Sequence, residues 1–304
     1  MKKVSILIPV YNEAGNIAPM LEALDKTLSD CYLYEILFID DGSSDKTLEL
    51  LKAVAESDSR VHYISFARNF GQQNALKAGM DLCTGDCAVM LDGDLQHPPE
   101  LIPKMLELWD DGYEIVYTRR KEDRRLSLYK RLTSSLFHRI LRSMSGMHIE
   151  QGIADFRLLD RKVLDVLASF HEPDLFLRGI VQWMGYRRFG LDYMPEQRFT
   201  GETKYNSIKL IKHAVQGITS FSVKPLYIAV FLGLLFVALS MSYLIYVLWR
   251  ATLGLGASGW ASTIVTVMFF GGLNMLLLGI IGIYVGKIFI QTKRRPTYIV
   301  REMN

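Results

Sequence analysis

Two long stretches near the C-terminus, Pro225–Trp249 and Ser262–Val285, contain no charged residue. The first has about 25 residues, so as an α-helix it would be roughly 37 Å long and could cross a bilayer with some tilt. The segment between the two stretches is short and rich in glycine. We therefore predict a transmembrane helical hairpin over residues 225–290 and a polar domain over residues 1–205.

The basic residues around this hairpin predict its orientation. Only Arg250 lies in the connection, whereas the outer ends carry Lys209, Lys212, Lys224, Lys287, Lys293, Arg294 and Arg295. The positive-inside rule then places the polar domain and the C-terminal tail, residues 291–304, in the cytoplasm. The odd number of cysteines, three, and the lack of an N-terminal signal segment lead us to expect a reducing cytoplasmic environment.

Residues 206–224 connect the polar domain to the hairpin. Their apolar side chains recur at a helical spacing between lysines and a histidine. This pattern predicts an amphipathic helix in the membrane interface, although a core helix of the polar domain would show the same pattern.

The first 120 residues alternate between short apolar runs and amphipathic stretches. We expect strands at Val4–Val10, Glu35–Asp40, Val61–Phe66, from Ala88 and at Glu114–Thr118, with helices at about Asn16–Leu28, Lys46–Ala55 and Gln72–Leu82. This alternation predicts an α/β domain with a mostly parallel sheet. In such sheets, ligands bind beyond the carboxyl ends of the strands.

Polar side chains follow several of these runs and should meet at one edge of the sheet. They are Tyr11, Asn12, Glu13, Asp40, Asp41, Arg68, Asp92 and Asp94. The chain has neither a GxGxxG fingerprint after its first strand nor a GxxxxGK[ST] loop. A nucleotide diphosphate bound at this acidic edge would therefore have to be held through a metal.

Asp92-Gly93-Asp94 is the most informative of these sites. Two carboxylates one residue apart at a strand end, with Gln96 beside them, offer oxygen ligands that suit Mg²⁺ or Mn²⁺. The alternative is a turn in which the aspartates only cap the helix that follows Pro98-Pro99.

Basic residues in the middle of the chain offer partners for a phosphate. Arg131 and Ser135 lie one turn apart on a predicted helix, so both can grip one phosphate group. Arg198 and Lys204 flank a glycine turn. The charged run Arg119–Arg125 is typical of a solvated loop, and the alternative is a lid that neutralises a bound phosphate.

Three motifs, Ile8–Glu13 (IPVYNE), Ile39–Asp45 (IDDGSSD) and Leu91–Glu100 (LDGDLQHPPE), resemble glycosyltransferase family 2, whose common fold is the nucleotide-sugar-binding GT-A fold. The resemblance implies a metal site formed by Asp92, Asp94 and Gln96. It implies that Asp41, rather than Asp40, contacts the base. The implied nucleotide-sugar site comprises Pro9, Tyr11, Asn12, Glu13, Asp41, Arg68 and Asp92.

The element Arg198–Tyr205 (RFTGETKY) resembles the R-x-x-G-E-[ST]-K-[YW] element of polyprenyl-phosphate glycosyltransferases, a resemblance that extends over nearly the whole chain. It implies that the acceptor phosphate is held by Arg131, Ser135, Arg198 and Lys204. It also places the catalytic acid in the D-F-R-L context of Asp155, which from the residues alone could be only a helix N-cap.

The resemblance implies inverting transfer of a sugar to undecaprenyl phosphate at the bacterial inner membrane. The first expectation for the donor is UDP-glucose, and UDP-GlcNAc, UDP-galactose and GDP-mannose stay open. The expected cofactor is Mg²⁺ or Mn²⁺, and the product would be a lipid-linked sugar for cell-envelope glycans. Relatives of this architecture also imply a homotetramer and a partner flippase. A net charge of +3 does not suggest nucleic-acid binding.

Three questions stay open at this stage. The acceptor could be another lipid such as diacylglycerol, or the chain could be an inactive scaffold that binds nucleotide sugar. Asp155 could be a general base, or it could orient a sugar hydroxyl or stabilise charge. A phosphomonoester has a second pKa near 6 and is largely deprotonated at pH 7. A general base would therefore have little to remove, which is why Asp155 could instead orient a sugar hydroxyl or stabilise charge.

Overall fold

The computed structural model describes residues 1–28, 31–120, 152–170, 172, 177–193, 222–253 and 259–304. The chain divides into two compact units. The first, called the head below, comprises Met1–His138, Met147–Asn206 and Arg295–Asn304, and the second comprises Arg139–Gly146 and Ser207–Arg294.

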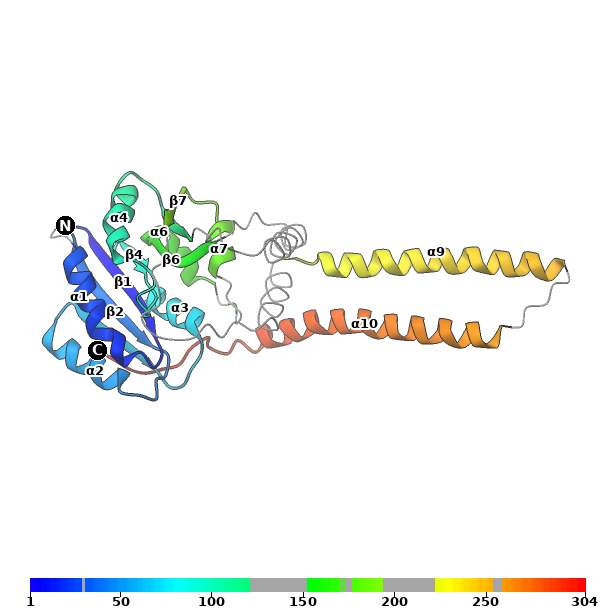
Figure 1. Cartoon of the computed structure of the whole chain (residues 1–304), viewed down its shortest axis with the longest axis horizontal. Coiled ribbons are helices and arrows are strands. Elements are labelled where there is room, and N and C mark those ends of the chain that lie inside the picture. Colours follow the sequence, from blue (N-terminus) through cyan, green and yellow to red (C-terminus); the bar gives the residue numbers. More distant parts are fainter. Residues whose placement is uncertain (29–30, 121–151, 171, 173–176, 194–221, 254–258) are drawn as a thin grey trace, which may run out of the picture. The chain divides into compact units, whose positions relative to one another are not determined.

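The described part of the head is built on an eight-stranded sheet (Figure 1). Its strands are β1 (Lys3–Val10), β2 (Leu33–Asp40), β3 (Val61–Phe66), β4 (Cys87–Met90), β5 (Ile115–Arg120), β6 (Ile153–Asp160), β7 (Arg188–Tyr193) and β8 (Val300–Met303). The order is β7-β5-β6-β4-β1-β2-β3-β8. Only β6 and β8 pair antiparallel with their neighbours, so the predicted mostly parallel sheet is confirmed.

Helices cover both faces of this sheet. They are η1 (Ala14–Asn16), α1 (Ile17–Thr27), α2 (Thr47–Ser57), α3 (Gln72–Leu82), η2 (Pro99–Leu101), α4 (Ile102–Asp110), α6 (Arg161–Ala168) and α7 (Leu177–Trp183). Apolar residues of α1, α2 and α4 share one core with Ile6, Ile8 and Phe38. Because successive strand residues point to opposite faces, Leu7 and Ile39 face the other layer, where α3 packs.

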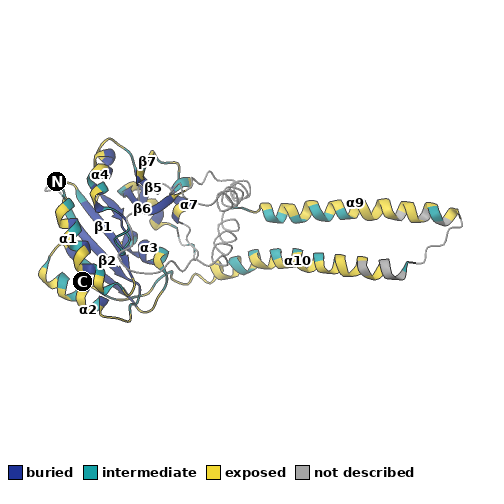
Figure 2. Ribbon diagram, viewed as in Figure 1, coloured by how far each residue is buried: buried dark blue, intermediate teal, exposed yellow. Residues whose placement is uncertain are grey.

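The central strands are buried on both faces, as their unbroken apolar runs require (Figure 2). Their register sets where the polar loops emerge. Val10 at the end of β1 pairs with Asp40 at the end of β2, and Leu7 pairs with Met90 of β4. The loops after these strands therefore leave the sheet at the same edge.

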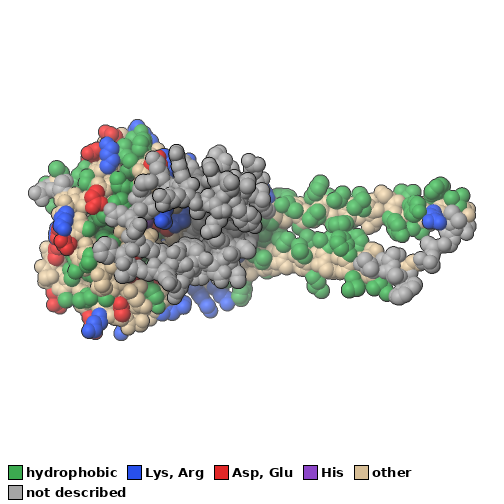
Figure 3. All heavy atoms as spheres, in the orientation of Figure 1, with side chains coloured by type: hydrophobic (Ala, Val, Ile, Leu, Met, Phe, Trp, Pro, Cys, Tyr) green, Lys and Arg blue, Asp and Glu red, His purple; other side chains and the backbone are tan. Residues whose placement is uncertain are grey.

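The second unit contains two long helices, α9 (Lys224–Thr252) and α10 (Trp260–Thr292). By length and composition, Lys224–Val247 and Thr266–Thr292 are each able to cross a membrane. The rings of Phe269 and Phe270 pack on Phe236, with centroids 5.8 and 5.4 Å away. Exposed hydrophobic side chains are distributed along both helices (Figure 3), a surface that suits lipid better than water. The interfacial helix predicted for residues 206–224 lies almost wholly outside the described residues.

The C-terminal residues differ from our expectation of a separate tail over 291–304. Arg295–Asn304 belongs to the head, where β8 pairs with the edge strand β3. Tyr298 stacks on Phe66 at a centroid distance of 5.4 Å and donates a hydrogen bond to Asp81 at 3.1 Å. This segment therefore completes the sheet after the chain has passed through both apolar helices.

Replacing Tyr298 by alanine should lower the free energy of unfolding by about 2 kcal/mol, because it removes both the ring stacking and the hydrogen bond. Tyr298→Phe keeps the stacking and should cost only about 1 kcal/mol. Thermal melts of the purified full-length protein measure both effects. A Tyr298→Ala variant as stable as the parent would show that this segment does not pack on the head.

Candidate active site

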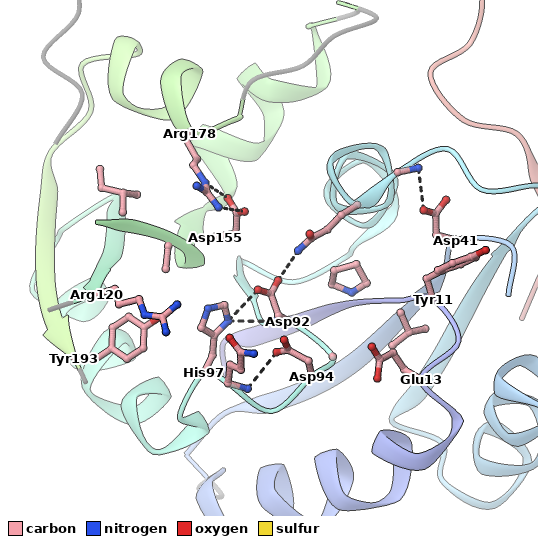
Figure 4. A pocket seen from close by; sticks show the side chains of 18 of the residues that line it. Tyr11, Glu13, Asp41, Asp92, Asp94, His97, Arg120, Asp155, Arg178 and Tyr193 are labelled. Atoms are coloured by element: carbon pink, nitrogen blue, oxygen red, sulfur yellow. Dashed lines mark hydrogen bonds and ion pairs between the residues drawn. The ribbon is translucent and has the colours of Figure 1, made fainter. Parts of the chain in front are cut away.

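A cavity of about 760 Å³ opens at the carboxyl edge of the sheet. Its wall is formed by the ends of β1, β2, β4, β5, β6 and β7 and by parts of α3 and α7. One side carries Tyr11, Glu13 and Asp41, whereas the other carries Arg120 and Arg178 (Figure 4). Of the eight polar side chains predicted to meet at this edge, Tyr11, Glu13, Asp41, Asp92 and Asp94 line the cavity.

The loops after β1 and β2 form the end of the cavity that contains Tyr11 and Glu13. Asn12, with a φ of 55°, accepts a hydrogen bond from the Ser44 backbone at 2.8 Å and so ties the two loops together. It does not line the cavity among the described residues. Burial raises the pKa of Glu13, against a hydrogen bond from Asn16.

The two aspartates of the β2 loop have different environments. Asp40 is buried and accepts hydrogen bonds from Ser43 and Ser65, so its role is structural. Asp41 lines the cavity and accepts the backbone N–H groups of Phe70 at 2.6 Å and Gly71 at 2.8 Å. Burial raises the pKa of Asp41 even though these two hydrogen bonds oppose the shift.

The loop after β2 requires a glycine at position 42. Its φ is 72°, and an added Cβ would lie 2.5 Å from the Arg68 carbonyl carbon. The side chain of Arg68 is exposed and lies over the Phe70 ring, with 4.4 Å between its guanidinium carbon and the ring centroid. Arg68 therefore supports the loop and does not line the cavity within the described residues.

Asp92, Asp94 and Gln96 follow β4 and all line the cavity. Gly93 lets this loop approach β1, because a Cβ there would lie 2.9 Å from Val10 Cγ1. Asp92 accepts a hydrogen bond from Gln72 at 2.6 Å, and Asp94 accepts one from the Gln96 backbone at 3.2 Å. Within the part of the chain that the structure describes, no lysine or arginine is seen in an ion pair with either carboxylate, and the one neighbouring imidazole, His97, lies 3.6 Å from Asp92.

The charges and donors of this loop fit a hard divalent cation. Burial, together with Asp155 and Asp94, raises the pKa of Asp92 to about 7, which indicates uncompensated negative charge. The buried Nε2 atom of Gln96, which has no hydrogen-bond partner among the described residues, is a donor and suits a substrate oxygen, whereas only the Oε1 atom of Gln96 can ligate a cation. No group of three His, Cys, Asp or Glu side chains forms a metal site in the described chain, so substrate oxygens would have to complete the coordination.

His97 is a site residue that the sequence did not reveal. Its Nδ1 accepts the Asp92 backbone N–H at 3.3 Å, and its ring stacks on Phe156 at a centroid distance of 5.3 Å. Burial lowers the pKa of His97 to about 4, so the imidazole is neutral at pH 7. It therefore braces the Asp92 loop as a hydrogen-bond acceptor.

Asp155 lies within β6 and caps no helix; the cap of α6 is Asp160, which accepts the Lys162 backbone N–H at 2.9 Å. The Asp155 side chain is 6% exposed and forms ion pairs with Arg157 at 2.6 Å and Arg178 at 2.7 Å. Burial alone would raise the pKa of Asp155, but the hydrogen bond from Arg178 and the charges of both arginines outweigh it and hold the pKa at about 2.

Both arginines were absent from the sequence-based site. Arg157 could have been found from the sequence, because it lies two residues after Asp155 in one strand and therefore shares a face of the sheet with it. Arg178 lies in a separate helix, and no local pattern connects it with Asp155. Four other predicted residues, Arg131, Ser135, Arg198 and Lys204, lie outside the described residues and remain predictions.

Comparison with known proteins identifies the family. The model of Glycosyl transferase family 2 matches residues 5–167. The chain belongs to glycosyltransferase family 2. The predicted family and the GT-A-like α/β fold are therefore confirmed, and the cavity at the sheet edge is a candidate glycosyltransferase active site.

Relatives match this glycosyltransferase over nearly its whole length. It is 41% identical to an uncharacterized glycosyltransferase of Bacillus subtilis (strain 168), covering 98% of this chain and 93% of that protein. It is 35% identical to the bactoprenol glucosyl transferase of Shigella phage SfX, covering 98% and 99% of the two chains. Among solved structures, mannosyl-3-phosphoglycerate synthase from Rubrobacter xylanophilus has a similar fold, with a TM-score of 0.50, 14% identity and 71% of each chain covered.

Proposed function

We propose that this glycosyltransferase transfers a sugar from a nucleotide sugar to polyprenyl phosphate, with undecaprenyl phosphate as acceptor and UDP-glucose as donor. The observation that carries the proposal is a single cavity with carboxylates on one side and arginines on the other. Full-length similarity to bactoprenol glucosyl transferases and two apolar helices suited to a membrane support the lipid acceptor.

In this proposal, the nucleoside lies near Tyr11, Glu13 and Asp41. Asp92 and Asp94 hold a divalent cation, Mg²⁺ or Mn²⁺, with Gln96 beside them; when bound, it stabilises the negative charge of the leaving diphosphate. The basic side of the cavity, which includes Arg120, receives the acceptor phosphate. Arg131, Ser135, Arg198 and Lys204 are proposed as further contacts to that phosphate.

The proposed reaction is a single displacement. An oxygen of the acceptor phosphate forms a bond to the anomeric carbon, on the face opposite the nucleotide. The bond from that carbon to the diphosphate oxygen breaks, and its electron pair leaves with the diphosphate. The configuration at the anomeric carbon is inverted. Because the phosphate is largely dianionic at pH 7, no proton has to be removed.

The direct test incubates purified full-length protein with a nucleotide sugar in the presence of Mn²⁺ or Mg²⁺, with undecaprenyl phosphate and diacylglycerol offered as acceptors in separate reactions. UDP-glucose, UDP-galactose, UDP-GlcNAc and GDP-mannose are compared, and the lipid product is identified by mass. We expect undecaprenyl phosphate that carries one glucose on its phosphate group. Transfer to diacylglycerol instead would reject the proposed acceptor, and no transfer from any donor would favour the scaffold alternative.

We propose that the head and the C-terminus lie in the cytoplasm of a bacterium. The return of β8 to the head sheet supports this arrangement, because a chain that leaves and re-enters one domain must cross a membrane an even number of times. The flanking basic residues then favour the cytoplasmic side. A homotetramer and a partner flippase remain predictions.

Cys31 offers a test of sidedness. It is exposed, whereas Cys83 and Cys87 are buried, so a membrane-impermeant maleimide should label one site on the folded head. We expect labelling in inverted inner-membrane vesicles and protection in intact spheroplasts, with Cys31→Ser as the unlabelled control. Labelling of Cys31 in intact spheroplasts would contradict the proposed orientation.

A further inference from the structure

The orientation of the Asp41 carboxylate depends on the loop that connects β3 to α3, residues 67–71. Its Oδ1 atom accepts the Phe70 backbone N–H at 2.6 Å, and its Oδ2 atom accepts the Gly71 backbone N–H at 2.8 Å. Both oxygens are therefore held by neighbouring residues of one loop. Because Asp41 lies in the cavity wall (Figure 4), a displacement of the 67–71 loop would move a group that a ligand can reach.

This loop is anchored at its two ends. At the α3 end, the side chain of Asn74 donates a hydrogen bond to the Phe70 carbonyl oxygen at 2.7 Å. At the β3 end, the Ala67 backbone N–H donates to the carbonyl oxygen of Ile299, in the C-terminal segment, at 3.0 Å. Residues 67–69 are exposed, so burial contributes little to holding them in place. The C-terminal segment therefore supplies one of the two anchors.

Three aromatic rings continue this anchor towards Asp41. The Tyr298 ring stacks on the buried Phe66 ring, with centroids 5.4 Å apart and 11° between the planes. Phe66 in turn meets the Phe70 ring edge to face, at 5.7 Å and 90°. Both arrangements are favoured between aromatic rings. We call Tyr298, Phe66 and Phe70 the aromatic row, because it connects the C-terminal segment with a residue that donates to Asp41.

The end of β3 is fixed from both sides. On one side, β8 pairs with β3, and the register shifts between Ser65 and Phe66. Irregularities of this kind change the direction of a strand and are common beside active sites. On the other side, the Ser65 hydroxyl donates a hydrogen bond to Asp40, at the end of β2, at 2.8 Å. The direction in which the chain leaves β3 therefore depends on β8 as well as on β2.

We propose that the C-terminal segment positions the 67–71 loop, and through it Asp41, for binding of a nucleoside, with Tyr298 as a positioning residue that acts through the aromatic row. This inference rests on the proposed function, in which the nucleoside of the sugar donor lies near Asp41. A loop that is held in place before its ligand arrives loses less conformational entropy on binding, so the ligand binds more tightly. In the sequence, both apolar helices lie between the loop and the segment that supports it.

The affinity for UDP, measured by calorimetry with Mn²⁺ and without acceptor, tests this role. We expect Tyr298→Ala to raise the Kd by about three- to tenfold, the range that the energy of one aromatic pair allows. Tyr298→Phe keeps the ring and should bind UDP within about twofold of the parent. A Tyr298→Ala variant that binds UDP as tightly as the parent would overturn the inference.

Trp109→Phe is the matched control, because it also weakens the head. Trp109 belongs to α4, in the layer opposite α3, and its indole Nε1 donates a hydrogen bond to Asp160 at 2.7 Å. Loss of this bond lowers stability, but it changes a contact in the other layer and should leave the Kd for UDP unchanged. An equal rise in Kd for Trp109→Phe would show that any loss of stability weakens binding, and Tyr298 would then not be a positioning residue.

Phe70→Leu tests the other end of the aromatic row and leaves β8 intact, so it serves if Tyr298→Ala does not fold. Phe70 is half-buried, and its backbone N–H to Asp41 is retained. We expect a similar rise in Kd, and the double variant should lie within about twofold of the larger single effect, because both changes break one chain of contacts. Effects that multiply in the double variant would show that Tyr298 does not act through the row, and the proposal would be wrong.

Steady-state rates separate positioning from a loss of folded protein. Tyr298→Ala should raise the KM for the nucleotide sugar while kcat stays within about twofold of the parent, because the Asp92 loop is not changed. A fall in kcat at unchanged KM would mean that Tyr298 only stabilises the head, which contradicts the proposal.

Hydrogen exchange of the full-length protein without ligand makes the test independent of the proposed function. The Phe70 and Gly71 amides donate to Asp41, so they report directly on the loop. Their exchange should be about tenfold faster in Tyr298→Ala and unchanged in Trp109→Phe. Unchanged exchange in Tyr298→Ala would reject the inference. Faster exchange, together with a parent protein that binds no UDP, would support the inference and reject the proposed donor.

Discussion

Replacing Asp94 by asparagine should lower the rate of sugar transfer by about a thousandfold or more. The substitution keeps the shape of the side chain and its hydrogen bond from the Gln96 backbone, but it removes one of the two carboxylates that face the cavity. Without that charge, the site loses affinity for a hard divalent cation, and the departing diphosphate loses its main source of charge stabilisation. Activity is measured as sugar-lipid formed over a titration of Mn²⁺.

Glu100→Gln is the matched control for this experiment. Glu100 lies near the same loop and is exposed, and it is not part of the cavity wall among the described residues. We expect this variant to transfer sugar at the parental rate with the same Mn²⁺ dependence. If Asp94→Asn formed sugar-lipid at the parental rate, the assignment of the Asp92 and Asp94 pair as a cation site would be wrong.

Replacing Asp155 by alanine should destabilise the head by about 3–5 kcal/mol, which corresponds to a fall in melting temperature of roughly 10 °C. The reason is that Arg157 is buried, so loss of its carboxylate partner leaves a positive charge with no compensation inside the protein. Asp155→Asn retains a hydrogen-bond acceptor and should cost less. Asp25→Ala breaks an exposed ion pair with Arg60 and should cost less than about 1 kcal/mol.

The same group predicts how stability depends on pH. The pKa of Asp155 is held at about 2, below its value in an unfolded chain, by the two arginines and against the effect of burial. The contribution of ionised Asp155 to the free energy of unfolding is therefore complete above about pH 4 and is lost as the pH falls towards 2. Thermal melts between pH 5 and pH 3 should show a smaller loss of stability for Asp155→Asn than for the parent. Equal acid sensitivity of the two proteins would contradict the ion-pair assignment.

Much of the fold followed from local sequence. The strands β1 to β5 and the helices α1 to α3 formed within a few residues of the predicted bounds, because apolar runs and amphipathic periods act over short distances. The predicted convergence of Tyr11, Glu13, Asp41, Asp92 and Asp94 also follows from short-range rules. Once the strands are parallel, their carboxyl ends meet at one edge.

Two predicted site residues have other places in the structure. Asn12 and Arg68 both follow strands, as expected, but Asn12 ties two loops together and Arg68 supports the Asp41 loop from outside. The position of a residue directly after a strand predicts at which edge of the sheet that residue lies. It does not specify whether the side chain points into the cavity or away from it, because that depends on how neighbouring loops pack.

Sequence alone was sufficient for the apolar hairpin, the alternating α/β head and the acidic edge, since each depends on residues close together in the chain. Contacts between distant segments required the tertiary structure. The four-residue strand β8 has no detectable pattern of its own and forms because the edge of β3 offers unpaired backbone groups. Likewise, the pairing of Asp155 with Arg178, 23 positions away in α7, is visible only in the folded chain, because burial and pairing are properties of the folded neighbourhood.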